Sequence, residues 1–275
     1  MLTTPATPLR FSRLLLTGAA GGLGRELRQR LKTYCDTLRL SDIQELEPAQ
    51  AAPGEEIMSC ALQDADAVMK LVEGVDAIVH MGGVSTEQPW APILAGNIMG
   101  VVNLYEAARR HGVKRIIFAS SNHVMGFYRQ DEVVDARTPP RPDGFYGLSK
   151  AFGEDVAQLY WDRWGIETVS IRIGSSFPEP RDRRMLATWL SYDDLERLVM
   201  AALTAPVVRH TIIYGTSDNQ TSWYDNTLAR HIGYRPQDSS DVFRAAVEAR
   251  QPVLDAQDAA VIHQGGAFVK AAPHG

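Results

Sequence analysis

The sequence has few cysteines and no long apolar run. The 275-residue chain contains two cysteines, Cys35 and Cys60, which are too few for a disulfide framework. Residues 1–12 lack the apolar core of a signal peptide. No stretch approaches the ~18 apolar residues that a membrane-spanning helix needs. We therefore expect a cytoplasmic protein with no membrane partner.

The chain also lacks a cluster of basic residues. Its 28 lysines and arginines face 33 aspartates and glutamates, which gives a formal net charge of -5. A nucleic-acid partner is not expected, because such binding depends on basic residues that neutralise phosphates. The seven histidines show no metal-ligand spacing, so no metal site is predicted.

Short apolar runs alternate with longer helical patterns along the chain. The runs are four to six residues long and mostly continuous, which is typical of strands buried on both faces of a parallel sheet. This alternation predicts an α/β fold, a Rossmann-type doubly wound parallel sheet. Strands are predicted at residues 13–17, 37–41, 56–60, 76–81, 115–120, 168–173 and 211–214, and helices at 22–32, 64–73, 90–111, 144–164 and 192–204.

A glycine-rich segment, TGAAGGLG, follows the first predicted strand and leads into the first helix. The N-terminus of a helix binds anions through its free N–H groups and its dipole. Gly18 permits the tight turn, Gly21 lets a pyrophosphate approach the backbone, and Gly24 lets the helix pack close to the strand. Such a turn also occurs for packing reasons alone, so the motif needs support from elsewhere in the chain.

The second predicted strand supplies that support, because it ends in a carboxylate. Asp42 lies 18 residues beyond Gly24, where it can accept hydrogen bonds from both ribose hydroxyls of an adenosine. The next residues, Ile43 and Gln44, include no arginine for a 2′-phosphate. The sequence therefore predicts NAD rather than NADP, the alternative being that Asp42 is a solvated turn residue.

A tyrosine and a lysine four residues apart provide candidate chemistry. Tyr146 and Lys150 share one face of the predicted helix 144–164. A phenol with a pKa of about 10 is a poor base at neutral pH, and the nearby ammonium is expected to lower that pKa. Tyr146 could then accept a proton from an alcohol. Ser121, after the fifth predicted strand, could bond the reacting oxygen.

Together these motifs resemble the extended short-chain dehydrogenase/reductase superfamily. The pattern consists of the glycine turn, Ser121 after a strand, Tyr146 and Lys150 further on, and Asn97 in the segment NIMG. The resemblance implies that Ser121, Tyr146 and Lys150 are catalytic. It also implies that Asn97 supports the active-site backbone and a proton-relay water.

The chain contains the segments FASSNHVMG, RIGSSFPEP and RRMLATWLS around the predicted cleft. These segments resemble those of superfamily members that oxidise hexuronic acids. Only 125 residues follow Lys150, which are few for a lobe that binds a nucleotide sugar. The resemblance implies NAD-dependent oxidation of the anomeric hydroxyl of D-glucuronate or D-galacturonate to the aldarolactone, which opens to the aldaric acid. The alternatives are a nucleotide-sugar epimerase or dehydratase and, less favoured, a non-catalytic NAD-sensing protein.

The same resemblance assigns contact residues. Arg184 would bind the substrate carboxylate, since a guanidinium matches a carboxylate in bidentate fashion. His123 could instead be a packed core histidine. Predicted substrate contacts are Ser85, Ser121, Asn122, His123, Tyr146, Ser175, Arg184 and Phe268; predicted cofactor contacts are Gly18, Gly21, Gly22, Leu23, Gly24, Asp42, Ile43, Leu62, Met81, Gly82, Gly83, Asn97, Lys150 and Ser176. One departure is Ala61, where related sequences carry an aspartate that bonds the adenine.

The chain is expected to form a single compact unit with two parts. We divide it into a flexible extension at 1–12, an NAD-binding domain at 13–174 and a smaller substrate-binding portion at 175–275 packed over the same sheet. The superfamily commonly associates through the helices predicted here at 90–111 and 144–164, so a homo-oligomer is expected.

Overall fold

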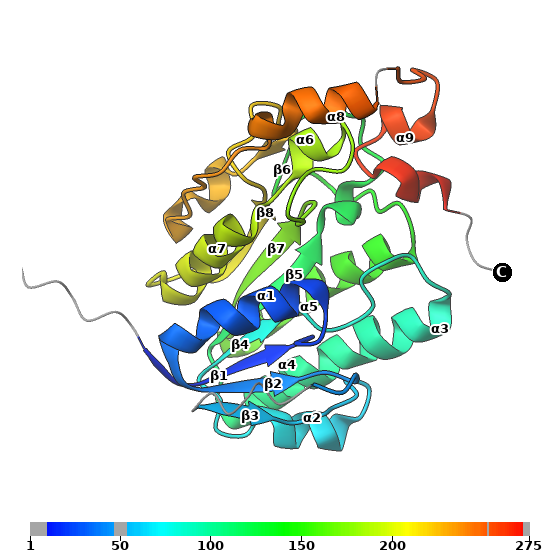
Figure 1. The fold of residues 1–275 in the computed structure, drawn as a ribbon. Helices are drawn as coiled ribbons and strands as arrows, with labels where there is room; N and C mark the ends of the chain where they lie inside the picture. Colours follow the sequence, from blue (N-terminus) through cyan, green and yellow to red (C-terminus); the bar gives the residue numbers. More distant parts are fainter. Residues whose placement is uncertain (1–9, 47–53, 252, 272–275) are drawn as a thin grey trace, which may run out of the picture.

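The computed structural model describes residues 10–46, 54–251 and 253–271. Its centre is a parallel sheet of seven strands in the order β3-β2-β1-β4-β5-β7-β8 (Figure 1). The strands are β1 (Phe11–Thr17), β2 (Cys35–Ser41), β3 (Glu55–Ile57), β4 (Ala77–His80), β5 (Arg115–Ser121), β7 (Glu167–Ile173) and β8 (His210–Gly215). The chain winds outward from β1 in both directions, which confirms the predicted doubly wound α/β fold.

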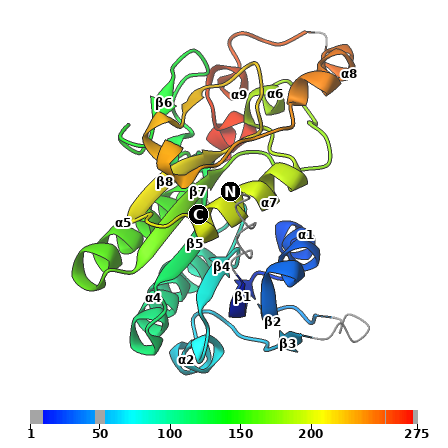
Figure 2. The same cartoon turned by 90° about the vertical axis from the view of Figure 1, so that its left-hand side faces the viewer.

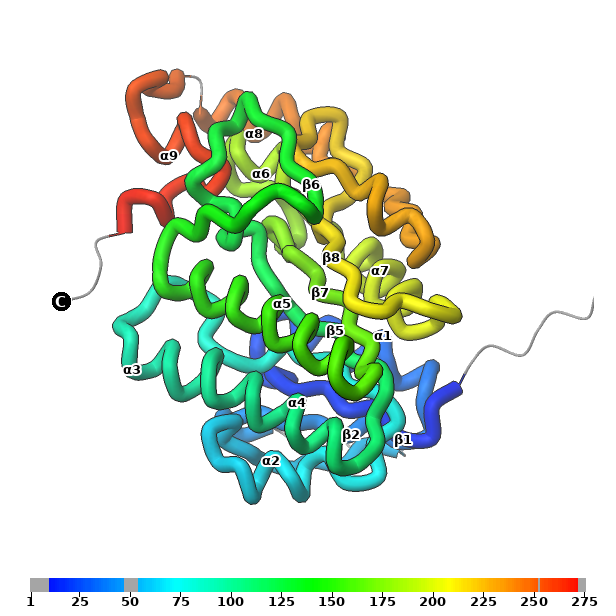
Figure 3. Tube along the Cα trace, turned by 180° about the vertical axis from the view of Figure 1, so that it is seen from behind, coloured from blue at the N-terminus to red at the C-terminus, as the bar shows by residue number. Residues whose placement is uncertain are grey.

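Helices cover both faces of the sheet. Helices α1 (Gly22–Leu31) and α7 (Tyr192–Thr204) lie on one face, and α2 (Ala65–Val72), α4 (Gly100–His111) and α5 (Phe145–Trp164) lie on the other (Figure 2). Seen from behind, α2, α4 and α5 lie side by side (Figure 3).

Alternate residues of β1 explain why both faces are covered. Leu14 and Leu16 pack in the core cluster under α1 and α7, whereas Leu15 packs in the cluster under α2, α4 and α5. All three leucines are fully buried, so a continuous apolar strand requires a layer on each side.

The predicted helix 90–111 is continuous but not uniform. It runs as α3 (Trp90–Ile93), a π-helical segment, η2 (Leu94–Met99), and then α4. A π-helical segment bulges the backbone and is frequent at functional sites. Here the bulge carries Asn97.

Shorter elements pack over the carboxyl ends of the strands. They are β6 (Val134–Asp135), which pairs with β9 (Tyr224–Asp225), helices α6 (Met185–Thr188), α8 (Arg244–Arg250) and α9 (Ala259–Ile262), and the 3₁₀ turns η3 (Asn122–Met125), η4 (Thr227–Ile232), η5 (Ser240–Phe243) and η6 (Gly266–Lys270). A further 3₁₀ turn, η1 (Lys32–Tyr34), joins α1 to β2. Most of this layer lies above the sheet in Figure 1.

Elements from before and after residue 174 are mixed in space, so the two predicted parts are not separate layers. β8 follows residue 174 but is the last strand of the main sheet, and α7, which also follows it, covers one face of that sheet. β6 precedes residue 174 but belongs to the upper layer. The division at 174 stays a prediction. Of the predicted extension, residues 1–9 lie outside the described residues, and β1 begins at Phe11. No helix in the described ranges is long and apolar enough to cross a membrane.

Candidate active site

A cleft of about 900 Å³ opens at the carboxyl ends of β1, β4, β5 and β7. Its lining includes every predicted site residue except Asn97. Those on the predicted cofactor side are Gly18, Gly21, Gly22, Leu23, Gly24, Asp42, Ile43, Leu62, Met81, Gly82, Gly83, Lys150 and Ser176; those on the predicted substrate side are Ser85, Ser121, Asn122, His123, Tyr146, Ser175, Arg184 and Phe268. The structure thus brings together residues that the sequence spreads over 250 positions.

The glycine turn leaves its backbone open to the cleft. Gly18 has a φ of 70°, in the left-handed region that favours glycine. A Cβ on Gly24 would overlap the carbonyl oxygen of Gly18, so helix and turn can pack this closely only without a side chain. Gly21 caps α1 without any side-chain hydrogen bond, and the first turn has no acidic residue. This cradle fits a pyrophosphate.

Asp42 lies beside the glycine turn. One carboxylate oxygen accepts a hydrogen bond from the Ala20 N–H at 3.0 Å, and the other accepts one from Gln44 N–H at 3.0 Å. Each oxygen retains a lone pair, so the fixed carboxylate can still accept hydrogen bonds from ribose hydroxyls. The residues present therefore fit NAD.

Asn97 stands behind the cleft rather than in it. Its Oδ1 accepts a hydrogen bond from Val84 N–H at 2.7 Å, and its Nδ2 donates to Val84 O and to Ser149 Oγ. The neighbouring Gly83 has a φ of 114° and approaches the amide so closely that a Cβ would clash with it. Asn97 holds the loop after β4 in place, and its direct contact with the cofactor stays a prediction.

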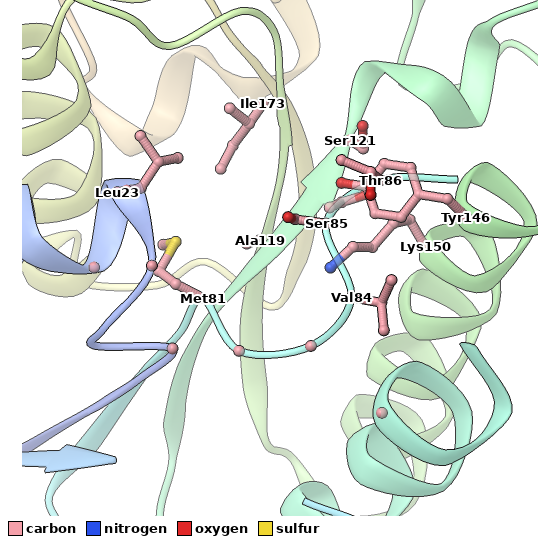
Figure 4. Close-up of a pocket in the computed structure, with 18 of the residues that line it drawn as sticks. Leu23, Met81, Val84, Ser85, Thr86, Ala119, Ser121, Tyr146, Lys150 and Ile173 are labelled. Atoms are coloured by element: carbon pink, nitrogen blue, oxygen red, sulfur yellow. The ribbon is translucent and has the colours of Figure 1, made fainter. Parts of the chain in front are cut away.

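Tyr146 and Lys150 project from the first turns of α5 into the cleft. Figure 4 shows them directed toward Ser121 and Ser85, with Leu23 and Met81 across the gap. Ser121 lies close enough to the Tyr146 hydroxyl to interact with it. The Lys150 ammonium lies 5.7 Å from the centre of the Tyr146 ring and 5.3 Å from that of Phe118.

The pKa of Tyr146 differs from the expectation. Burial raises the pKa of Tyr146 to about 12, and the interaction with Ser121 opposes this rise only in part. Burial also lowers the pKa of Lys150 to about 8. In the protein itself, desolvation therefore outweighs any benefit of the ammonium to the phenolate, a cost that the spacing of the two residues does not reveal.

A residue that the sequence analysis missed fixes the start of α5. Glu87, on the loop that also carries Ser85, accepts hydrogen bonds from Phe145 N–H and Tyr146 N–H, each at 2.9 Å. A carboxylate suits the positive end of a helix dipole. Glu87 therefore ties the substrate-side loop to the helix that carries the catalytic candidates.

Arg184 has a free hydrogen-bonding edge. Its Nε donates to Gln264 O at 2.5 Å and its Nη1 lies 3.5 Å from Ser175 Oγ, while its buried Nη2 has no partner within the described ranges. Gln264 is fully buried and donates to Arg129 O and Glu132 O, which anchors it. An unpaired buried guanidinium N–H is costly, so this edge is suited to bind an anion.

Aromatic contacts complete the substrate side. The rings of His123 and Phe268 stack with centres 3.8 Å apart, and the edge of His123 meets Tyr146 at 5.8 Å. Asn122 donates to Tyr224 OH at 3.3 Å. Phe268 comes from the C-terminal turn η6, so the far end of the chain closes the cleft.

Fold and site together define a Rossmann-type, NAD-dependent dehydrogenase. A family model described as "NAD dependent epimerase/dehydratase family" matches residues 14–208. Uronate dehydrogenase of Pseudomonas putida is 63% identical over 273 residues, which cover 99% of each chain. The chain therefore belongs to the NAD dependent epimerase/dehydratase family and, within it, to the uronate dehydrogenases.

Solved structures agree. Glucuronic acid dehydrogenase from Chromohalobacter salexigens is 52% identical, with a TM-score of 0.93 over 96% of this chain and 98% of that one. A tyrosine-to-alanine variant of uronate dehydrogenase from Agrobacterium tumefaciens, complexed with NAD, is 48% identical, with a TM-score of 0.93 over 96% and 98%. The predicted family resemblance, dehydrogenase class and NAD cofactor are confirmed.

Proposed function

We propose that this chain oxidises the anomeric hydroxyl of hexuronic acids, D-glucuronate and D-galacturonate, to an aldarolactone that water opens to the aldaric acid. The observation that carries the proposal is the buried Arg184 Nη2, which has no hydrogen-bond partner among the described residues and belongs to the same cleft as Ser121, Tyr146 and Lys150. The relatives are named uronate dehydrogenase and glucuronic acid dehydrogenase, which supports this class of substrate.

The chain's own residues would carry out the proton step. Tyr146 and Ser121 bind the anomeric hydroxyl, and Tyr146 takes its proton as the carbon–hydrogen bond breaks. NAD, when bound, supplies the hydride acceptor and a positive charge that favours a phenolate. Lys150 stays close enough to the Tyr146 ring to stabilise the phenolate once it forms.

Arg184 would set specificity for acids. Its open edge binds the substrate carboxylate, while the hydroxyls of Ser85 and Ser175 and the amide of Asn122 bond the sugar hydroxyls. Phe268 covers the sugar from the C-terminal turn. Because Gln264 O fixes the guanidinium from the far side, the arginine is already oriented before substrate binds.

The assembly and location follow as further parts of the proposal. Exposed apolar side chains on the helical face of η2, α4 and α5 include Leu94, Met99, Val102, Leu148 and Leu159, and this face would join copies of the chain in a homo-oligomer. The two cysteines are free and buried, as suits a reducing cytoplasm.

A parallel assay tests the function. NADH formation would be followed with NAD and D-glucuronate, D-galacturonate, D-glucose or UDP-glucose. We expect reduction of NAD with both uronates and little with glucose. No NADH with any of the four compounds, together with NAD that stays bound through gel filtration, would instead support a nucleotide-sugar epimerase.

A further inference from the structure

A buried carboxylate lies behind His123. The Asp143 side chain has no exposed surface, and its Oδ2 lies 2.7 Å from His123 Nδ1. Its other oxygen, Oδ1, has no hydrogen-bond partner among the described residues. Asp143 immediately precedes the N-cap of α5, the helix that carries Tyr146. The carboxylate is therefore buried with His123 as its main side-chain partner.

Two glycines make room for this carboxylate. A Cβ on Gly126 or on Gly265 would overlap Asp143 Oδ2. These glycines come from the end of η3 and from the C-terminal turn. A Cβ on Gly147 of α5 would chiefly overlap His123 O and would also come within 3.2 Å of Asp143 Oδ1. Two separate segments thus leave room for one acidic side chain, which indicates a built feature rather than a chance contact.

The pair fixes which nitrogen of His123 carries the proton. A carboxylate can only accept a hydrogen bond, so His123 Nδ1 must donate. Burial lowers the pKa of His123, against the opposing effects of Asp143 and Glu87 and together with the charge of Arg184. The ring is then neutral at neutral pH, and Nε2 holds a lone pair. No hydrogen bond within the described ranges occupies Nε2, and the ring lines the cleft.

We propose that Asp143 is a positioning residue that fixes the Nδ1–H form of His123, so that Nε2 accepts a hydrogen bond from a hydroxyl of the substrate. The proposal rests on the proposed function for the identity of that substrate. The cleft then has a hydrogen-bond donor at Arg184, for the substrate carboxylate, and a hydrogen-bond acceptor at His123, for a substrate hydroxyl. A sugar acid bound the wrong way round would place its carboxylate against the His123 lone pair and be rejected.

The stacked rings hold the acceptor in place. Phe268 covers one face of His123, and Tyr146 meets its edge, so the imidazole cannot turn freely. Rotation by a half turn would also break the hydrogen bond with Asp143. The acceptor therefore points at a fixed position next to the catalytic tyrosine, where a hydroxyl close to the reacting carbon would lie.

The first test does not depend on activity. In ¹⁵N NMR spectra of the whole protein at neutral pH, with the His123→Ala variant used to assign the signals, we expect a protonated Nδ1 and an unprotonated Nε2. In Asp143→Asn the amide can also donate, so the two forms should mix. A protonated Nε2 in the unsubstituted protein would overturn the proposal.

The second test is kinetic. Asp143→Asn keeps the side-chain size, and we expect the KM for uronate to rise about 10-fold, the effect of one misplaced hydrogen bond, with the KM for NAD unchanged. In a His123→Ala background, the same substitution should not raise the KM for uronate any further. A further rise of about 10-fold in the KM for uronate in that background would show that Asp143 acts through packing, and it would refute the positioning role.

A matched control removes an equal charge elsewhere. Asp155→Asn changes an exposed carboxylate on α5 and should leave the KM for uronate within about 2-fold of its value in the unsubstituted protein.

If the unsubstituted protein oxidises no uronate, the proposed function fails, whereas the NMR result still decides the tautomer. If Asp143→Asn does not fold, the spectrum of the unsubstituted protein remains decisive.

Discussion

The two sides of the cleft are built in different ways. On the cofactor side, the pyrophosphate cradle is one contiguous strand, turn and helix that presents its backbone, and its glycines matter because they lack side chains. On the substrate side, polar and aromatic side chains from distant segments converge: Ser85, Ser121, Tyr146, Arg184 and Phe268.

The difference separates what the family shares from what a member can change. Backbone N–H groups and a helix dipole bind any dinucleotide pyrophosphate, so this side has little freedom to vary. Side chains held by long-range hydrogen bonds can be replaced one at a time, which alters the substrate and leaves the fold intact. If this contrast holds, substitutions on one side should leave binding on the other side unchanged.

The largest effect should come from Tyr146→Phe, at the border between the two sides. The change removes one oxygen and leaves the buried ring in place, so the fold should persist. We expect kcat to fall by about 10³-fold or more, since a positioned proton acceptor contributes up to about 10⁴-fold. Steady-state kinetics and a calorimetric titration with NAD provide the measurement. A variant that keeps a tenth of the activity, or one that loses NAD binding, would contradict the assignment.

Arg184→Ala should affect the substrate side alone. Truncating one partner of a buried charged pair costs about 2–5 kcal/mol, so the KM for uronate should rise about 30-fold or more. The Kd for NAD, measured by calorimetry, should not change. The control is Arg181→Ala, an exposed neighbour whose loss should alter neither constant. Equal losses for NAD and uronate would mean that the two sides are not independent.

The same contrast explains how much the sequence could predict. The positions of the glycine turn and of Asp42 could be predicted because local spacing determines their geometry. Most strands were predicted to within two residues, but β3 ends at Ile57 rather than residue 60, because the chain then turns toward the cleft, which Cys60 and Leu62 line.

Long-range pairs could not be predicted in this way. Glu87 caps a helix 58 residues later, and Gln264 holds an arginine 80 residues earlier. No periodicity carries that information, since such pairs exist only after the chain has folded. The raised pKa of Tyr146 was missed for the same reason, because burial belongs to the assembled cleft.

Gly24→Ala should affect the cofactor side alone. The new methyl group would overlap Gly18 O, and overpacking of this kind costs about 1–3 kcal/mol. We expect a lower free energy of unfolding and an NAD Kd about 10-fold higher, with the KM for uronate at saturating NAD unchanged. The matched control for the free energy of unfolding is Gly22→Ala, two residues earlier, where a Cβ meets no atom of the described residues within 4 Å. Equal destabilisation by both would show that α1, not the turn, is sensitive.

The smallest effect should come from Ala61→Asp, which adds a side chain to the cofactor side. Ala61 precedes Leu62 and Gln63, which both line the cleft, and its carbonyl oxygen accepts a hydrogen bond from Asp64 N–H at 2.9 Å. An aspartate at this position could accept a hydrogen bond from the adenine amino group, a contact worth about 0.5–1.5 kcal/mol. We expect the Kd for NAD to fall several-fold with kcat for uronate unchanged, and calorimetry would measure the first. The matched variant Ala61→Asn can offer the same acceptor without the charge, so it should recover part of the gain. If neither variant tightens NAD binding, the side chain at position 61 does not reach the adenine, and the cofactor side gains nothing from an acceptor there.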